Sequence, residues 1–99
     1  MAEVLKIHKQ ALAEQDIIDI WLYSFANWGR AQADKYHDQL DSAFSLIAEN
    51  PSIGVVCGIV REGYRKYHVN RHLVMYRFSK TTLQIVRVLG EEMDYKAHF

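Results

Sequence analysis

The spacing of hydrophobic residues changes from a period of two to a helical period early in the chain. Within residues 3–8, Leu5 and Ile7 fall on one face, which predicts a short strand. From about residue 11 the spacing predicts a helix of about 16 residues that ends near Gly29, because glycine readily adopts the left-handed conformation at helix ends. The predicted buried stripe of this helix consists of Ala13, Ile17, Ile20, Trp21, Ser24 and Trp28.

A second helical pattern spans about residues 30–49. Its apolar stripe consists of Tyr36, Leu40, Ala43, Phe44 and Ile47. Asn50 and Pro51 end it, since proline disfavours helical geometry in the preceding residue and asparagine tolerates a left-handed cap. The link between the two patterns is very short, so residues 11–50 should form an antiparallel helical hairpin.

The C-terminal half has β character. Residues 64–69, 72–78 and 83–89 are rich in Tyr, Val, Ile, Leu and Phe and are separated by short polar turns, which predicts three consecutive antiparallel strands. Residues 55–60 are apolar but interrupted by glycine, and fit either a strand or a buried extended loop. The predicted fold is α+β, in the order β-α-α-β-β-β, with the helical hairpin packed on an antiparallel sheet.

Two apolar residues of the first helix, Ile18 and Leu22, lie off its stripe. One interpretation is a wide core face, and the other is a surface groove that binds a helix or strand of a partner.

Composition narrows the class of protein. With 99 residues, the chain is long enough for one domain, residues 1–99, and too short for a two-domain enzyme. Its only cysteine, Cys57, cannot form an internal disulfide, and no Cys/His pair has zinc-finger spacing, so we expect a reduced protein without structural metal. No apolar run approaches the roughly 18 residues of a membrane helix, and we expect a cytoplasmic protein.

Charge is distributed unevenly although the formal net charge is zero. Zero net charge argues against strong binding to nucleic acid by the chain alone. Residues 1–50 carry a net charge of −4, whereas residues 61–87 hold seven basic residues and one acidic residue, a local +6. The basic half is therefore where an anionic partner would dock. Within it, Arg87 stands in an apolar strand, either on the exposed face or partly buried with a carboxylate partner.

A series of motifs in a fixed order covers most of the chain. These are Asp16-Ile17, Ile20-Trp21-x-Tyr23, Trp28-Gly29, Ala33-x-x-Tyr36-x-x-x-Leu40, Ile47-x-x-Asn50-Pro51-x-x-Gly54, Arg65-x-Tyr67-x-Val69-x-Arg71-His72, Tyr76-Arg77 and Ile85-Val86-Arg87-Val88-Leu89. Together they resemble the ParE branch of the RelE/ParE superfamily of bacterial toxins. The sequence departs from the pattern at Gly90 and Glu92, where many members have a histidine and an arginine, and this departure argues against catalysis.

From the residues themselves we expect neither a cofactor nor catalysis. The resemblance implies a compact toxin with a helical hairpin against an antiparallel sheet. It would poison DNA gyrase, through the A subunit, by trapping the cleaved-DNA complex, and would contact DNA only indirectly. A ParD-type antitoxin would neutralise it by folding its C-terminal segment on the toxin surface. A further hypothesis is that the chain is an inactive relative retained only as an antitoxin partner.

The alternative is a ribosome-dependent mRNA endoribonuclease of RelE type. That reaction needs a general base, a general acid and cations in one pocket. The candidate cations are Arg65, Arg71, Arg77 and Arg87, the candidate acids His72 and Tyr76, and the candidate bases Glu62 and Glu91.

Binding residues are expected where arginine and aromatic side chains alternate, because these residue types dominate interface hot spots. The predicted antitoxin contacts are Ile18, Leu22, Tyr64, Arg65, Tyr67, Arg71, Tyr76, Arg77 and Arg87. The predicted contacts with the target are Arg61, Arg65, Arg87, Met93 and Tyr95, since residues 91–99 are a plausible part of the inhibitory surface of such a toxin. An antitoxin tail that complements the +6 segment would be acidic.

Overall fold

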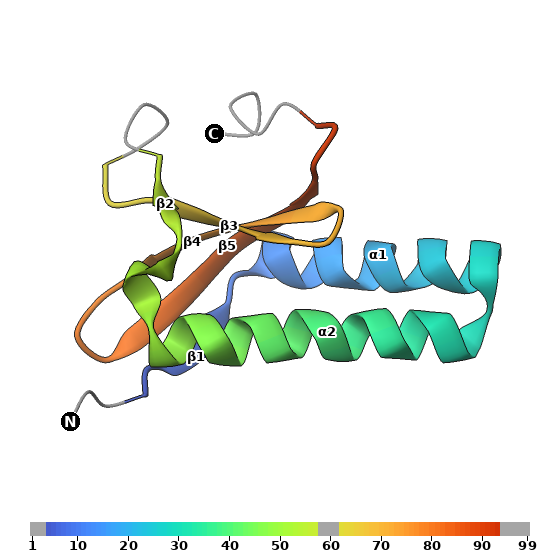
Figure 1. Cartoon of the computed structure of the whole chain (residues 1–99), viewed down its shortest axis with the longest axis horizontal. Coiled ribbons are helices and arrows are strands. Elements are labelled where there is room, and N and C mark those ends of the chain that lie inside the picture. The colour runs from blue at the N-terminus through green and yellow to red at the C-terminus, as the bar shows by residue number, and fades with distance from the viewer. Residues whose placement is uncertain (1–3, 58–61, 94–99) are drawn as a thin grey trace.

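A computed structural model describes residues 4–57 and 62–93 of the chain. Two long helices lie against one twisted sheet (Figure 1). In chain order the elements are β1 (Lys6–Lys9), α1 (Ala11–Trp28), α2 (Arg30–Glu49), the 3-10 turn η1 (Pro51–Ile53), β2 (Val55–Val56), β3 (Arg65–Val69), β4 (His72–Phe78) and β5 (Thr82–Gly90). The predicted α+β class is confirmed.

The sheet is mixed, with the strand order β1-β5-β4-β3-β2. Strands β2 to β5 pair antiparallel, as the short turns between β3, β4 and β5 predict. The prediction of a wholly antiparallel sheet is wrong, because β1 pairs parallel with β5, with Lys6 opposite Thr82 and Lys9 opposite Ile85. The helical hairpin between β1 and the other strands is long enough for the crossover that a parallel pair requires. Of the apolar stretch 55–60, Val55 and Val56 form a short strand and residues 58–60 lie outside the described part.

The predicted helical hairpin is confirmed, and α1 is two residues longer than expected. Gly29 links the helices with a φ of 87°, which favours glycine, and its N–H donates to the Phe25 carbonyl. Asn50 ends α2 with a φ of −141°, so the predicted left-handed cap is wrong. The cause is Pro51, which favours extended geometry in the residue before it. Neither helix is long and apolar enough to cross a membrane.

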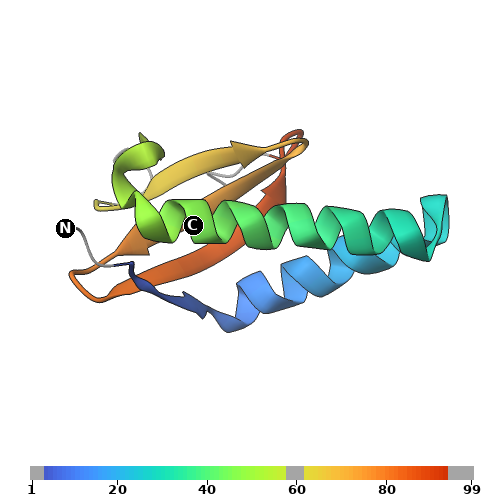
Figure 2. The same ribbon diagram turned by 60° about the horizontal axis from the view of Figure 1, so that its bottom comes forward.

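The hairpin covers one face of the sheet (Figure 2). Its buried side chains include Ile17, Leu40 and Phe44, which belong to the same core cluster as Val74 and Ile85 of the sheet. The predicted stripe of α2 is confirmed.

The predicted stripe of α1 is confirmed at Ala13, Ile17 and Ser24, which are buried. It is wrong at Trp28, which is 64% exposed. Trp28 lies at the end of the hairpin that projects beyond the sheet, where no strand is available to cover it (Figure 1).

Candidate functional site

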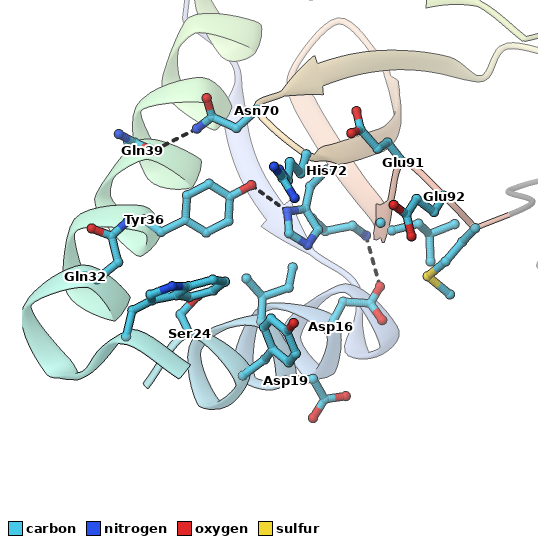
Figure 3. A pocket seen from close by; sticks show the side chains of 18 residues that line it. Asp16, Asp19, Ser24, Gln32, Tyr36, Gln39, Asn70, His72, Glu91 and Glu92 are labelled. Carbon is cyan, nitrogen blue, oxygen red and sulfur yellow. Dashed lines mark hydrogen bonds between the residues drawn. The ribbon is translucent and has the colours of Figure 1, made fainter. Parts of the chain in front are cut away.

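A groove of about 770 Å³ lies between the two helices and one end of the sheet (Figure 3). We call it the hairpin groove. One wall comes from α1 and the other from α2, and the ends are formed by the β3–β4 turn and by residues 88–93. Cavities of this size accommodate several side chains of a ligand or partner.

An ion pair fixes α1 against β5 beside this groove. Asp16 accepts hydrogen bonds from Arg87 Nε at 2.7 Å and from Arg87 Nη2 at 2.9 Å. It also accepts one from the backbone N–H of Val88 at 3.0 Å, beyond the point where β1 stops pairing with β5. Of the two interpretations of Arg87, partial burial with a carboxylate is confirmed. The hydrogen bond to Asp16 raises the pKa of the Arg87 guanidinium above its ordinary value.

Tyr36 and His72 are hydrogen-bonded across the floor of the groove. The Tyr36 hydroxyl donates to the Val69 carbonyl at 3.2 Å and shares a second hydrogen bond with His72 Nδ1. Burial lowers the pKa of His72, and the charge of Glu91 opposes this shift. Burial also raises the pKa of Tyr36. His72 is therefore an uncharged, oriented group at neutral pH, a role that local sequence could not indicate because its partner lies 36 residues away.

Acidic groups outnumber basic ones along the described lining. Asp19, Glu91, Glu92 and Arg71 line the groove, whereas Asp16 is neutralised by Arg87. Such a surface repels the phosphates of RNA.

The exposed positions of α1 resolve the two interpretations of its off-stripe residues. Ile18 is 52% exposed and Leu22 is 53% exposed, so the wide core face is wrong and an apolar surface remains. At 100° per residue, these two side chains point away from the hairpin groove, which Asp16, Ile20 and Tyr23 face. Of the predicted antitoxin contacts, Ile18 and Leu22 therefore lie on the outer face of α1, whereas Arg71 lines the hairpin groove.

Tyr76 has no exposed surface and cannot act as an anchor on the protein surface, so this part of the prediction is corrected. Its side chain points toward the helices from the middle of the sheet. The hydroxyl accepts a hydrogen bond from the Gly54 N–H at 2.9 Å and donates one to the Pro51 carbonyl at 2.7 Å. Tyr64 is also buried, and Tyr67 is half-buried against the core.

The predicted arginines lie at different places on the sheet. Arg65 donates to the carbonyls of Gly54 at 2.8 Å and Ser52 at 3.3 Å, and Arg77 lies over the ring of Tyr64. Arg71 is in the turn at the opposite end of β3 and lines the hairpin groove. The arginines of the basic segment 61–87 therefore do not form one patch, because Arg65 binds the carbonyls before β2, Arg71 lines the groove and Arg87 is bound to Asp16.

The residues predicted to contact the target are only partly described. Met93 is exposed and lines the groove, whereas Arg61 and Tyr95 lie outside the described residues.

Among the described residues, His37, Asp38 and Asp41 of α2 have ligand atoms within 4.8 Å of one another, as a metal site would require. Asp41 is already paired with Lys9, whose Nζ lies 3.7 Å from Oδ1, and with His37 at 3.5 Å. These pairs account for the cluster without an ion.

Of the groups considered for RNA cleavage, Arg71, His72 and Glu91 line the hairpin groove together. Tyr76 is buried elsewhere, and Glu62 does not belong to the groove. Arg87 is held by Asp16.

Comparison with known proteins identifies the family. Residues 5–95 match the family described as "ParE toxin of type II toxin-antitoxin system, parDE". The chain is 38% identical over 86 residues to Toxin ParE1 of Caulobacter vibrioides, covering 87% of this chain and 88% of that one. It is 37% identical over 83 residues to Toxin ParE1 of Mycobacterium tuberculosis, covering 83% of this chain and 85% of that one.

A solved structure shares the fold. It is a chain from a structure titled "Chromosomal ParDE TA system from P. aeruginosa", with a TM-score of 0.77 and 15% identity over 90% of this chain and 98% of that one. The family match over residues 5–95 and the two relatives above 30% identity decide the assignment: this chain belongs to the ParE toxin family of type II toxin–antitoxin systems.

Proposed function

We propose that this chain inhibits DNA gyrase by trapping its cleaved-DNA complex, and that a ParD-type antitoxin neutralises it. Membership of the ParE family carries the proposal, because gyrase poisoning is the activity implied by the resemblance to this branch. The related structure from P. aeruginosa is titled as a ParDE system, which supports a ParD-type partner.

The antitoxin would contact the toxin on two sides of α1. The hairpin groove offers a concave surface, and Ile18 with Leu22 offers an exposed apolar one. A segment that folds on binding can cover both, since such segments wrap large surfaces.

The chain would act by binding and would not cleave a bond. Arg87, a candidate cation for phosphorane stabilisation, is bound to Asp16 instead. Gly90 and Glu92 stand where many members have a histidine and an arginine.

A gyrase assay with purified chain, freed of antitoxin, tests the proposal. We expect loss of supercoiling and accumulation of linear DNA after protein denaturation, and both effects should disappear when the antitoxin is added first. The matched control is heat-unfolded chain. Full supercoiling at large molar excess of folded chain would refute gyrase as the target.

One observation favours the second candidate, an mRNA endoribonuclease of RelE type: Arg71, His72 and Glu91 line one groove. This candidate predicts cut transcripts on translating ribosomes, and loss of cutting in a folded His72→Gln variant. If neither gyrase nor mRNA is affected while antitoxin binding persists, the chain is an inactive relative.

A further inference from the structure

We infer that the hairpin groove binds a segment of the antitoxin that is apolar and positively charged. This inference rests on the proposed function, because it specifies the chemistry of the partner at the same surface. It differs from the expectation of an acidic tail, which followed from the basic character of residues 61–87.

The groove presents apolar and aromatic surface to a partner. Ile20 and Tyr36 are half-buried along it, and Tyr23 and Trp28 are each 64% exposed at its rim. Met93 adds an exposed apolar side chain at the β5 end. Such an arrangement, with large rigid side chains around a hollow, favours a partner segment that inserts apolar residues.

The charge of the groove selects among apolar segments. In the described lining, Asp19, Glu91 and Glu92 have no ion-pair partner among the described residues, and Asp19 only accepts a hydrogen bond from Gln15. Arg71 is a single opposing charge, since Arg87 is bound to Asp16. The described lining therefore has a surplus of two negative charges on a chain whose net charge is zero. A segment with lysine or arginine is attracted there, and an acidic segment is repelled.

The position of these charges orients the bound segment. Figure 3 shows Asp19, Glu91 and Glu92 on the α1 and β5 side of the groove. Gln32 and Gln39 of α2 lie on the other side with Tyr36, where Gln39 accepts a hydrogen bond from Asn70 at 2.8 Å. The basic side chains of the segment should therefore face the β5 end, and its apolar side chains should face Tyr36 and α2. The exposed rings of Tyr23 and Trp28 can also contact a guanidinium.

Two synthetic peptides test this inference on the whole chain. Both carry one apolar helical pattern, and they differ only in having arginine or glutamate at the polar positions. Binding is measured by fluorescence anisotropy at two salt concentrations. We expect the arginine peptide to bind at least about tenfold more tightly, with the difference reduced at high salt. Equal or tighter binding of the glutamate peptide would overturn the inference, and so would failure of both peptides to bind.

Variants locate the interaction. The double variant Glu91→Gln/Glu92→Gln removes two exposed charges from the groove and should weaken the arginine peptide about five- to tenfold. The matched control is Glu49→Gln, an exposed residue at the end of α2 that does not line the groove, and it should leave binding unchanged. Circular dichroism checks that both variants remain folded. Equal binding by the double variant and the control would place the peptide elsewhere and overturn the inference.

The outcome is independent of the gyrase assay. If gyrase is unaffected but the arginine peptide binds in the groove, the target is wrong and the groove inference stands. If the chain poisons gyrase and its copurifying antitoxin neutralises the wild type and the double variant equally well, only the groove inference fails.

Discussion

The carboxylate of Asp16 links α1 to the end of β5, and its removal should destabilise the fold. In an Asp16→Ala variant, the Arg87 guanidinium would lose its counter-charge and two hydrogen bonds, and the Val88 N–H would lose its acceptor. Because the side chains of Arg87 and Asp16 are only 16% and 13% exposed, water can replace the lost interactions only in part.

The expected cost follows from this geometry. Removing one partner of a fully buried ion pair costs about 3–5 kcal/mol, and an exposed pair contributes less than about 1 kcal/mol. The partial exposure of this pair places Asp16→Ala at about 2–4 kcal/mol, or a fall in Tm of about 10–25 °C for a domain of this size.

Replacing both charges should recover most of this loss. The double variant Asp16→Leu/Arg87→Met leaves no unpaired charge, and apolar replacements of buried ion pairs are often neutral. The unsatisfied Val88 N–H should leave a residual cost of about 1 kcal/mol. Asp19→Ala is the control, since Asp19 is exposed on the same helix and should change stability by less than about 0.5 kcal/mol.

Urea denaturation followed by circular dichroism measures these differences, provided that the m-values agree. Two results would refute the reasoning. One is an Asp16→Ala variant within about 0.5 kcal/mol of wild type. The other is a double variant that loses as much as the sum of the two single variants, because contacting residues should instead be coupled.

Three further predictions concern the core, the buried histidine and the exposed face of α1. Gly54→Ala should destabilise the chain by more than about 1 kcal/mol, because the added Cβ would lie 2.5 Å from the Tyr76 hydroxyl and 2.8 Å from a backbone carbonyl oxygen; chemical denaturation measures this, and a neutral variant would contradict the close contact. Burial lowers the pKa of His72 below its ordinary value of 6.5, so the unfolded state binds more protons in acid and wild-type stability should fall as the pH drops below about 6.5. A His72→Asn variant should show a smaller fall in its urea midpoint between about pH 6.5 and 5, and parallel curves would contradict this assignment. Leu40→Ala should lower the free energy of unfolding by about 2–5 kcal/mol, because Leu40 is 1% exposed. Ile18→Ala should lower it by less than about 1 kcal/mol, because Ile18 is 52% exposed. Thermal denaturation measures both, and similar losses of stability would mean that the outer face of α1 is covered in solution.

Local patterns predicted the elements well because each depends on neighbouring residues. The second helix was predicted at residues 30–49, and α2 spans Arg30–Glu49. Helical periodicity also placed Ile18 and Leu22 off the buried stripe, but it left open whether a wide core face covers them, and only the structure shows that both are exposed. The sequence could not predict that β1 joins the sheet parallel to β5, because a six-residue pattern contains no information about the strand beside it.

The candidate site was harder to predict because its contacts are distant in sequence. The sequence pointed to a basic half of the chain and to Arg71 and Met93, which do line the groove. It did not indicate that the groove also collects Asp19 and Glu91, which come from opposite halves of the chain and make its lining acidic.

By itself, the sequence determined the helical hairpin, the strands other than β2 and the family resemblance, because each of these is encoded by residues that are close together or by their order. Tertiary structure alone decided that Arg87 binds a carboxylate 71 residues away, that Tyr76 is buried, and that the groove is negatively charged. The physical reason is that burial and charge pairing depend on which surfaces the folded chain brings into contact.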